Sequence, residues 1–308
     1  MTNFFKAFCA LCFFVCFTAC EKESVTITDN ADNGSVPVQI VSTSKISATP
    51  QYCGMYVSDF ETICGNPVSE NLLLTWCQLH HINALSLYGL GTILNSTSNY
   101  PILANFIKKA KLQYGIKQVA AVRGSATNVI GQTASYNTSR ADTTERFNYM
   151  HLELEWWNNA CTYANYLSQL TTIKQWGDAQ PKKVYTEEYM GWFKNPTGQD
   201  SLMASGLIKN SHRIFVHDYV TTPNFSYMKN RLDYIGRAAK ALNKTAEVII
   251  IFSAQPTYSY NYFLTHTFDN AYQAIVNGYN AATFTGKNYI NITGYQIFDS
   301  NSARIVQP

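Results

Sequence analysis

The sequence has 308 residues, of which 14% are charged and 14% are aromatic, and its formal net charge at pH 7 is +3. The charged fraction lies well below the roughly one quarter that is usual for globular proteins, which predicts a large buried core. So small a net charge is too mild to suggest nucleic-acid binding, and no nucleic-acid partner is expected.

The first 19 residues are predicted to be a signal peptide. Lys6 precedes an apolar run over Ala7–Phe17 that is too short to cross a bilayer as a helix. The sequence Phe17-Thr18-Ala19-Cys20 resembles a bacterial lipobox, which predicts cleavage before Cys20 and lipidation of that cysteine. An ordinary secretory signal that is cut near Ala19 is the alternative.

Residues 20–50 are predicted to form a flexible tether, because they are rich in Ser, Thr, Asn, Asp and Val and lack helical periodicity. The cluster Glu21-Lys22-Glu23-Ser24 is similar to the surface-export signals of some bacterial lipoproteins. We therefore expect an exported protein at the outer membrane or cell surface, held to the membrane by its lipid anchor only. No later segment of the sequence is apolar over a length that would span a bilayer.

From residue 51 to residue 308, short runs of β-forming residues alternate with stretches of helical periodicity. The predicted strands are Gly54–Asp59, Ile82–Tyr88, Lys117–Arg123, Tyr149–Trp156, Lys183–Met190, Arg213–Val220, Glu247–Ser253 and Ile290–Phe298. The predicted helices include Glu70–His80, Ile102–Tyr114, Trp157–Gln175, Ser201–Lys209, Tyr227–Leu242 and Tyr260–Gly278. This order predicts one parallel sheet, and eight such units close most economically into a single-domain α/β fold, the (β/α)8 or TIM barrel. An open doubly wound sheet is the alternative, although no glycine-rich phosphate loop follows the first strand.

Four of the eight cysteines lie in the predicted barrel domain after the lipobox, namely Cys53, Cys64, Cys77 and Cys161. An exported compartment permits disulfides, but the sequence does not decide which pairs form. The spacing of these cysteines matches no zinc module. We expect structural roles for all four, and we expect no metal and no cofactor.

The predicted strand Tyr149–Trp156 carries an ordered row of ionisable residues. Apolar residues occupy its even positions, whereas the odd positions include His151, Glu153 and Glu155. Burial of an unpaired carboxylate costs several kcal/mol, so the row needs an explanation. Barrel active sites form at the carboxyl ends of the strands, which places Glu155 in a predicted site. The alternative is an ion-pair network in which Arg123 pairs with Glu153.

One metal ion cannot bind both ends of this row. His151 and Glu155 would lie about 13 Å apart along an extended strand, at ~3.3 Å per residue.

The segment from Asn148 to Glu155 resembles the fourth-strand signature of glycoside hydrolase family 18, the chitinases and endo-β-N-acetylglucosaminidases. That signature is Asp-x-x-Asp-x-Asp-x-Glu, and here Asn148, His151 and Glu153 take the three aspartate places. Two strands later, His217-Asp218-Tyr219 falls where the family has Met-x-Tyr. On the last strand, Gly294–Phe298 resembles a segment that ends in a sugar-stacking tryptophan. Only Glu155 and Tyr219 match the family in identity.

The resemblance implies substrate-assisted hydrolysis of a glycan that contains N-acetylglucosamine. Glu155 would be the acid and base, Glu153 would polarise the acetamido group, and Tyr219 would bond the acetamido oxygen. Further side chains at or near the strand ends are the expected contacts to the glycan: His151, His217, Trp192, Gln255, Gln296 and Phe298.

The departures from the family pattern leave two hypotheses about turnover. A glutamate at position 153 moves the carboxylate outward by about one bond length, and a misplacement of ~1 Å can cost about a hundredfold in rate. We favour a surface lipoprotein that recognises the glycan without turnover, over an active retaining hydrolase. Both hypotheses make the glycan the ligand and glycan-uptake machinery the expected protein partner. A structural or adhesive lipoprotein is the third hypothesis.

Four other acids lie on predicted strands or at their ends, namely Glu187, Glu188, Asp218 and Asp299. Alternation along the fifth strand sends one of the adjacent pair Glu187 and Glu188 into the barrel. A second carboxyl group about 6.5–9.5 Å from the first would suit an inverting hydrolase. For each acid by itself, a solvated or helix-capping role is the stronger expectation.

Overall fold

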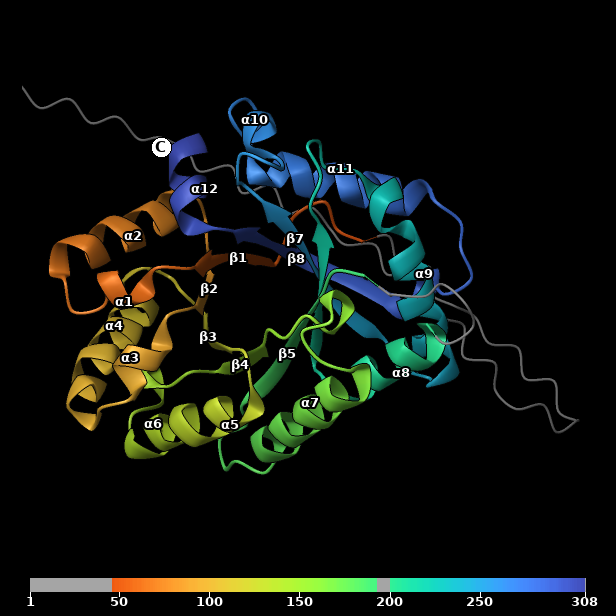
Figure 1. The fold of residues 1–308 in the computed structure, drawn as a ribbon. Coiled ribbons are helices and arrows are strands. Elements are labelled where there is room, and N and C mark those ends of the chain that lie inside the picture. Colours follow the sequence, from red (N-terminus) through yellow and green to blue (C-terminus); the bar gives the residue numbers. More distant parts are fainter. Residues whose placement is uncertain (1–45, 193–199, 308) are drawn as a thin grey trace, which may run out of the picture. The chain divides into compact units, whose positions relative to one another are not determined.

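The computed structural model describes residues 46–192 and 200–307, and in them the strands close into a barrel (Figure 1). The strands are β1 (Tyr52–Val57), β2 (Ala84–Leu87), β3 (Gln118–Arg123), β4 (Tyr149–Leu152), β5 (Tyr185–Met190), β6 (Arg213–Asp218), β7 (Ala246–Ser253) and β8 (Ile290–Phe298). Each strand pairs in parallel with the next, and β8 closes the ring against β1. The predicted (β/α)8 TIM barrel is confirmed.

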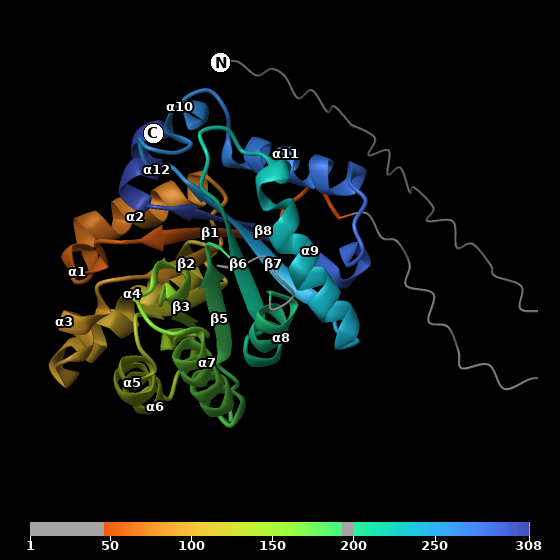
Figure 2. The same cartoon turned by 45° about the vertical axis from the view of Figure 1, so that its right-hand side comes forward.

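Helices surround the ring of strands, as Figures 1 and 2 show. They are α1 (Phe60–Ile63), α2 (Pro67–Leu79), α3 (Leu90–Leu94), α4 (Tyr100–Gln113), α5 (Ala126–Asn128), α6 (Ala134–Ser139), α7 (Tyr163–Asp178), α8 (Asp200–Asn210), α9 (Phe225–Ala241), α10 (Tyr260–Phe263), α11 (Phe268–Ala281) and α12 (Ser300–Val306). Among the residues described, no helix combines the length and the apolar character that crossing a bilayer requires.

Two predicted helices begin or divide elsewhere because of capping residues. The predicted helix Tyr260–Gly278 is two helices, since Thr267 is the N-cap of a capping box that starts α11. The predicted helix Trp157–Gln175 begins only with α7, because the Thr162 hydroxyl accepts a hydrogen bond from the backbone N–H of Asn165.

Strand β4 ends at Leu152, four residues before the predicted end. The backbone N–H of Glu153 still donates to the carbonyl of Arg123 at 3.0 Å. Beyond it, the N–H of Trp156 donates to the carbonyl of Leu154, so the chain turns into a short 3-10 helix, η4 (Trp156–Asn158). Glu155 therefore lies in the loop after β4, and the prediction that it is a strand residue is wrong.

A column of polar side chains runs through the barrel interior. The Tyr56 hydroxyl lies 2.9 Å from Nε2 of His151, and Nδ1 of His151 lies 3.4 Å from Oε2 of Glu187. The other Glu187 oxygen accepts from Nη1 of Arg213 at 2.9 Å, and Nε of Arg213 donates to Glu247 at 2.9 Å. Glu187 thus points into the barrel, as alternation along β5 predicts.

Glu188, the next residue, points outward and is fully buried against α7. The Tyr166 hydroxyl donates to its Oε2 at 2.8 Å, while its Oε1 has no hydrogen-bond partner among the described residues. Burial raises the pKa of Glu188 to about 8, and the bond from Tyr166 lowers it only in part. The folded protein therefore holds this carboxyl group in its neutral form at pH 7.

Replacement of Glu188 by Gln should change how stability depends on pH. The unfolded chain loses this proton near the ordinary pKa of 4.5 and the folded chain near 8, so the folded state binds one more proton between those values. The free energy of unfolding therefore falls as the pH rises through this window, by about 1.4 kcal/mol for each pH unit. Gln does not ionise, so the free energy of unfolding of Glu188→Gln should not fall in this way. Relative to the wild type, the variant should therefore become more stable as the pH rises from 5.5 to 8. Urea unfolding of both proteins at pH 5.5 and pH 8 measures this change. If the free energies of unfolding of variant and wild type differ by the same amount at both pH values, the prediction is wrong.

The described part of the chain includes the end of the predicted tether. The backbone N–H of Ile46 donates to Oδ1 of Asn280 at 3.3 Å, and Nδ2 of Asn280 donates to the Ile46 carbonyl at 3.2 Å. The predicted signal peptide, Cys20 and residues 20–45 of the tether lie outside the described residues. The four other cysteines are free thiols in this structure: Cys53, Cys64, Cys77 and Cys161.

Candidate functional site

The carboxyl ends of the strands form one end of the barrel, called the mouth below, and three predicted site residues meet there. Glu153 follows β4, Tyr219 follows β6, and Phe298 ends β8. The ring of Phe298 lies 6.1 Å from that of Tyr219 and 5.7 Å from that of Tyr56 on β1. The charge of Glu153 acts on both Tyr219 and Tyr56. The barrel therefore gathers one carboxyl group and several aromatic rings at its mouth.

Glu153 lies among four tyrosines, called the tyrosine cluster below: Tyr56, Tyr88, Tyr189 and Tyr219. The Tyr88 hydroxyl is hydrogen bonded to Glu153, whereas the Oε2 atom of Glu153 is shielded from solvent and has no partner among the described residues. Burial raises the pKa of Glu153 above its ordinary value, although the Tyr88 bond and the nearby His151 oppose this. The Glu153 carboxyl group is thus placed to exchange a proton.

The hydroxyl groups of the tyrosine cluster are neutral donors. Burial raises the pKa of all four far above 10, and the charge of Glu153 raises them further. A neutral phenol that is partly removed from water donates a strong hydrogen bond to an oxygen that becomes negative.

Glu155 stands at the outer side of this arrangement. The Tyr189 hydroxyl donates to its Oε1 at 3.1 Å, and the Asn158 amide donates to its Oε2. Glu155 is half-buried, and its charge further raises the pKa of Glu153. Both carboxyl groups of the predicted site therefore lie at the mouth, but their neighbours differ.

His151 lies below Glu153 and is fully buried. A carboxylate only accepts hydrogen bonds, so Nδ1 of His151 carries a proton that faces Glu187, and Nε2 lies 2.9 Å from the Tyr56 hydroxyl. His151 was predicted to contact a ligand. In the structure it instead supports the tyrosine cluster from the barrel interior, through the Tyr56 hydroxyl.

His217 is a buried spacer between two members of the cluster. Its ring stacks on that of Tyr219 at 4.0 Å and 8°, and it meets the ring of Tyr189 at 4.3 Å. Burial, together with the charge of Arg231, lowers the pKa of His217 to about 3, so the ring is neutral near pH 7. Gly191 allows this packing, because a Cβ atom there would lie 3.2 Å from Nδ1 of His217.

Three further predicted ligand contacts have other neighbours than Glu153 and the tyrosine cluster among the described residues. Trp192 is 48% exposed and packs on α9, where its ring covers the Arg231 guanidinium at 4.9 Å. Gln296 is fully buried in the interior, where it accepts from the Tyr52 hydroxyl at 2.8 Å. Its position on β8 points it into the packed interior, which keeps it from a ligand at the mouth. Gln255 donates to Asp299 at 3.2 Å.

The predicted alternative, an ion pair between Arg123 and Glu153, is not seen among the described residues; Arg123 instead donates to Gln132. Asp299 caps α12 by accepting from the N–H of Ser302, which confirms the capping role expected for such acids. In the same part of the chain, no group of three or more His, Cys, Asp or Glu side chains is arranged to hold a metal ion.

Two residues that shape the site were missed in the sequence. Tyr56 and Arg213 both occupy inward positions of their strands, two or four residues from other polar or aromatic inward residues. An arginine directly before the apolar run Ile214–Val216 is the signal that could have identified Arg213, since a charge at the start of a buried strand needs a buried partner.

Several solved structures share this fold at low sequence identity. Hydroxymethylglutaryl-CoA lyase from Pseudomonas aeruginosa is 8% identical, with 82% of this chain and 77% of the lyase covered and a TM-score of 0.47. A Toxoplasma gondii protein assigned as a deoxyribose-phosphate aldolase is 11% identical, with 84% and 92% covered and a TM-score of 0.45. 2,3-Dimethylmalate lyase is 9% identical, with 80% of this chain and 75% of the lyase covered and a TM-score of 0.43. These likenesses concern the barrel fold alone.

The resemblance to glycoside hydrolase family 18 is wrong. No family model and no curated protein matches the sequence. The Asn148 side chain accepts from the N–H of Val119 beside the amino end of β4. A fourth-strand motif in which only Glu155 is identical was too weak to identify a family. The predicted recognition or hydrolysis of a glycan is withdrawn with it, whereas the glycan-uptake partner stays a prediction.

Proposed function

We propose that this barrel is an enzyme that moves a proton to and from a carbon atom next to a carbonyl group, with Glu153 as the acid–base. One observation about Glu153 carries the proposal. Glu153 has an unpartnered, shielded carboxyl oxygen amid the hydroxyl groups of the tyrosine cluster at the mouth of a barrel. Barrel active sites lie at this end.

The raised pKa of Glu153 supports its role as the base. A general base works best when its pKa lies near the working pH, since it is then both available and strong enough to take a proton. Burial supplies this shift for Glu153. The unpartnered Oε2 is the atom that would receive the proton.

The tyrosine cluster supplies the other half of the chemistry. Removal of a proton next to a carbonyl group leaves negative charge on the carbonyl oxygen, and neutral hydroxyl donors in an apolar site stabilise such an oxyanion. Tyr219 is partly exposed, and His217 and Phe298 hold its ring from two directions. We assign Tyr219 as the donor to the substrate oxygen.

Tyr56 and His151 are positioning residues in this proposal. His151 is held by Glu187 and bonds to the hydroxyl of Tyr56, whose ring packs against Phe298. A support of this kind keeps the groups at the mouth in one geometry, which matters because a displacement of ~1 Å can cost about a hundredfold in rate.

Solvent isotope exchange tests the proposal without knowledge of the product. The protein is incubated in D2O with pools of small aldehydes, ketones and 2-oxo acids, and the proton signals next to each carbonyl group are followed by NMR. At least one compound should lose its signal faster with the protein than with heat-inactivated protein. If no pool shows exchange that depends on the folded protein, the proposal is wrong.

The rate of exchange should depend on pH through Glu153. Only the ionised carboxylate accepts a proton, and burial raises the pKa of Glu153 above the ordinary 4.5. The rate constant kcat/KM should therefore fall about tenfold for each pH unit below this raised pKa. A profile between pH 4 and pH 9 measures the midpoint, and a midpoint at or below 4.5 would assign the proton transfer to another group.

A further inference from the structure

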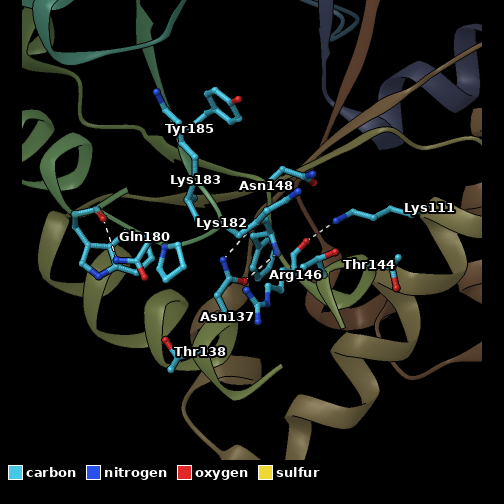
Figure 3. Close-up of a pocket in the computed structure, with 15 residues that line it drawn as sticks. Lys111, Asn137, Thr138, Thr144, Arg146, Asn148, Gln180, Lys182, Lys183 and Tyr185 are labelled. Atoms are coloured by element: carbon cyan, nitrogen blue, oxygen red, sulfur yellow. Dashed lines mark hydrogen bonds between the residues drawn. The ribbon is translucent and has the colours of Figure 1, made fainter. Parts of the chain in front are cut away.

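A cavity of about 490 Å³ lies at the end of the barrel opposite the mouth (Figure 3). It opens beside the amino ends of β4 and β5, and side chains from α4, α6 and α7 complete its wall. Four cationic residues line it, and these are called the basic pocket below: Lys111, Arg146, Lys182 and Lys183. No aspartate or glutamate is among the fifteen residues drawn around it.

Three of the four cations have no ion-pair partner among the described residues. Nζ of Lys111 donates to the backbone carbonyl of Arg146 at 2.5 Å. The Nε and Nη2 atoms of Arg146 both donate to the carbonyl of Arg140. Lys182 is exposed at the wall of the cavity, and its ammonium group has no ion-pair partner in the described part of the chain. Backbone carbonyls hold these side chains in place but do not neutralise their charge.

The acids nearest to the basic pocket are already matched by cations. Asp142 and Glu145 pair with Lys108 at 2.8 and 3.3 Å, and Glu145 also pairs with Arg140 at 4.0 Å, so two cations match the two carboxylates. Asp178 pairs with Lys183 at 3.1 Å and also with Lys174. The positive charge on the wall of the cavity is therefore not cancelled by its surroundings.

Lys111 is a largely buried cation of the basic pocket that lacks a counter-charge. Burial lowers the pKa of Lys111 to about 8, and the charge of Asp142 restores it only in part. A desolvated ammonium group without an anion is unfavourable, so an anion bound beside it would be stabilised.

The arrangement also distinguishes between kinds of anion. A carboxylate is bound best by the two parallel N–H groups of an arginine fork, but Arg146 uses two of its nitrogens on the Arg140 carbonyl. Lysines bind phosphate as point charges, and a tetrahedral phosphate accepts donors from several directions. Lys111, Arg146 and Lys182 come from three different segments around the cavity (Figure 3).

We infer that the basic pocket binds a small phosphate-bearing molecule. Its volume lies within the range of small-molecule sites, about 300–1,000 Å³. Trp176, Pro181 and Phe147 add apolar lining for the part of the ligand that carries the phosphate. The inference concerns the end of the barrel away from Glu153 and does not rest on the proposed function.

Calorimetric titration of the full-length protein with inorganic pyrophosphate tests the inference, with citrate as a carboxylate of similar charge. Both titrations are run at about 0.15 M ionic strength, where exposed charges are screened beyond about 8 Å. Saturable binding of pyrophosphate that is at least about fivefold tighter than that of citrate is the expected result. An equal or tighter binding of citrate overturns the assignment to phosphate, and no saturable pyrophosphate binding overturns the site.

Two charge reversals locate the binding. Lys182→Glu places a negative charge at the opening and should weaken pyrophosphate binding by about tenfold or more. Lys240 lies on α9, is also exposed and does not line the basic pocket. Lys240→Glu changes the net charge by the same amount, so it should weaken pyrophosphate binding less than twofold. Both residues are exposed, and matching melting curves would verify that both variants fold. Equal weakening by the two variants would show non-specific attraction and overturn the site.

Discussion

Glu153→Gln is expected to slow the exchange of carbonyl-adjacent protons by about 10²–10⁴-fold, the usual contribution of a positioned general base. Gln keeps the shape of the side chain and can still accept the hydrogen bond from Tyr88, but it cannot take a proton. Because Glu153 is neutralised rather than removed, the fold should remain. The exchange rate of the most reactive compound, measured by NMR in D2O, reports the effect.

Glu188→Gln is the matched control for this result. It also replaces the carboxyl group of a buried glutamate on a barrel strand by an amide, but Glu188 faces α7 and contacts no member of the tyrosine cluster among the described residues. Its exchange rate should stay within about threefold of the wild type, since it does not touch the site. A Tyr219→Phe variant should fall between the two, because it removes one donor to the oxyanion. Equal rates for Glu153→Gln and the wild type would exclude Glu153 as the base.

Arg213→Met is expected to lower the free energy of unfolding by about 3–5 kcal/mol, the range for a buried ion pair that loses one partner. Arg213 is 6% exposed, and its guanidinium bonds to Glu187 at 2.9 Å and lies over the rings of Tyr52 and Tyr149. Without it, the carboxylate of Glu187 would be left in the barrel interior with His151 as its remaining partner. Urea unfolding at pH 7 measures the loss.

Two comparisons separate the buried pair from its exposed neighbour. Glu247→Gln removes the other partner of Arg213, but the Glu247 side chain is 36% exposed, so the loss should be about 0–1 kcal/mol. The double variant Arg213→Met with Glu187→Gln should recover part of the loss, because no uncompensated charge then remains. A loss in Arg213→Met no larger than in Glu247→Gln would mean that the interior column contributes little.

Alternation along the strands allowed part of the site to be predicted. Apolar residues at the even positions of the segment after Asn148 required that His151 and Glu153 face the interior, and both do. The same rule required one of Glu187 and Glu188 to face inward. The rule failed at Glu155, since it applies only while the chain remains a strand and β4 ends at Leu152.

The family assignment failed for a different reason. It rested on a short motif in which all three aspartates were replaced and only Glu155 was identical, so chance could produce this identity and the single further one at Tyr219 on another strand. Such a motif describes spacing along one strand, and spacing alone does not specify a ligand. The chemistry of the mouth is set instead by residues on several strands.

By itself, the sequence determined the number and order of the strands, their parallel pairing and the closed barrel, because hydrophobic periodicity and short connections are local properties of the chain. Only the tertiary structure decided which polar groups meet. Tyr56 and His151 are 95 positions apart, and Glu187 and Arg213 are 26 apart, yet each pair forms a hydrogen bond. Such pairs arise from barrel closure and from the rotation of side chains in a packed interior, which no local pattern records. The same closure separates the tyrosine cluster at one end of the barrel from the basic pocket at the other.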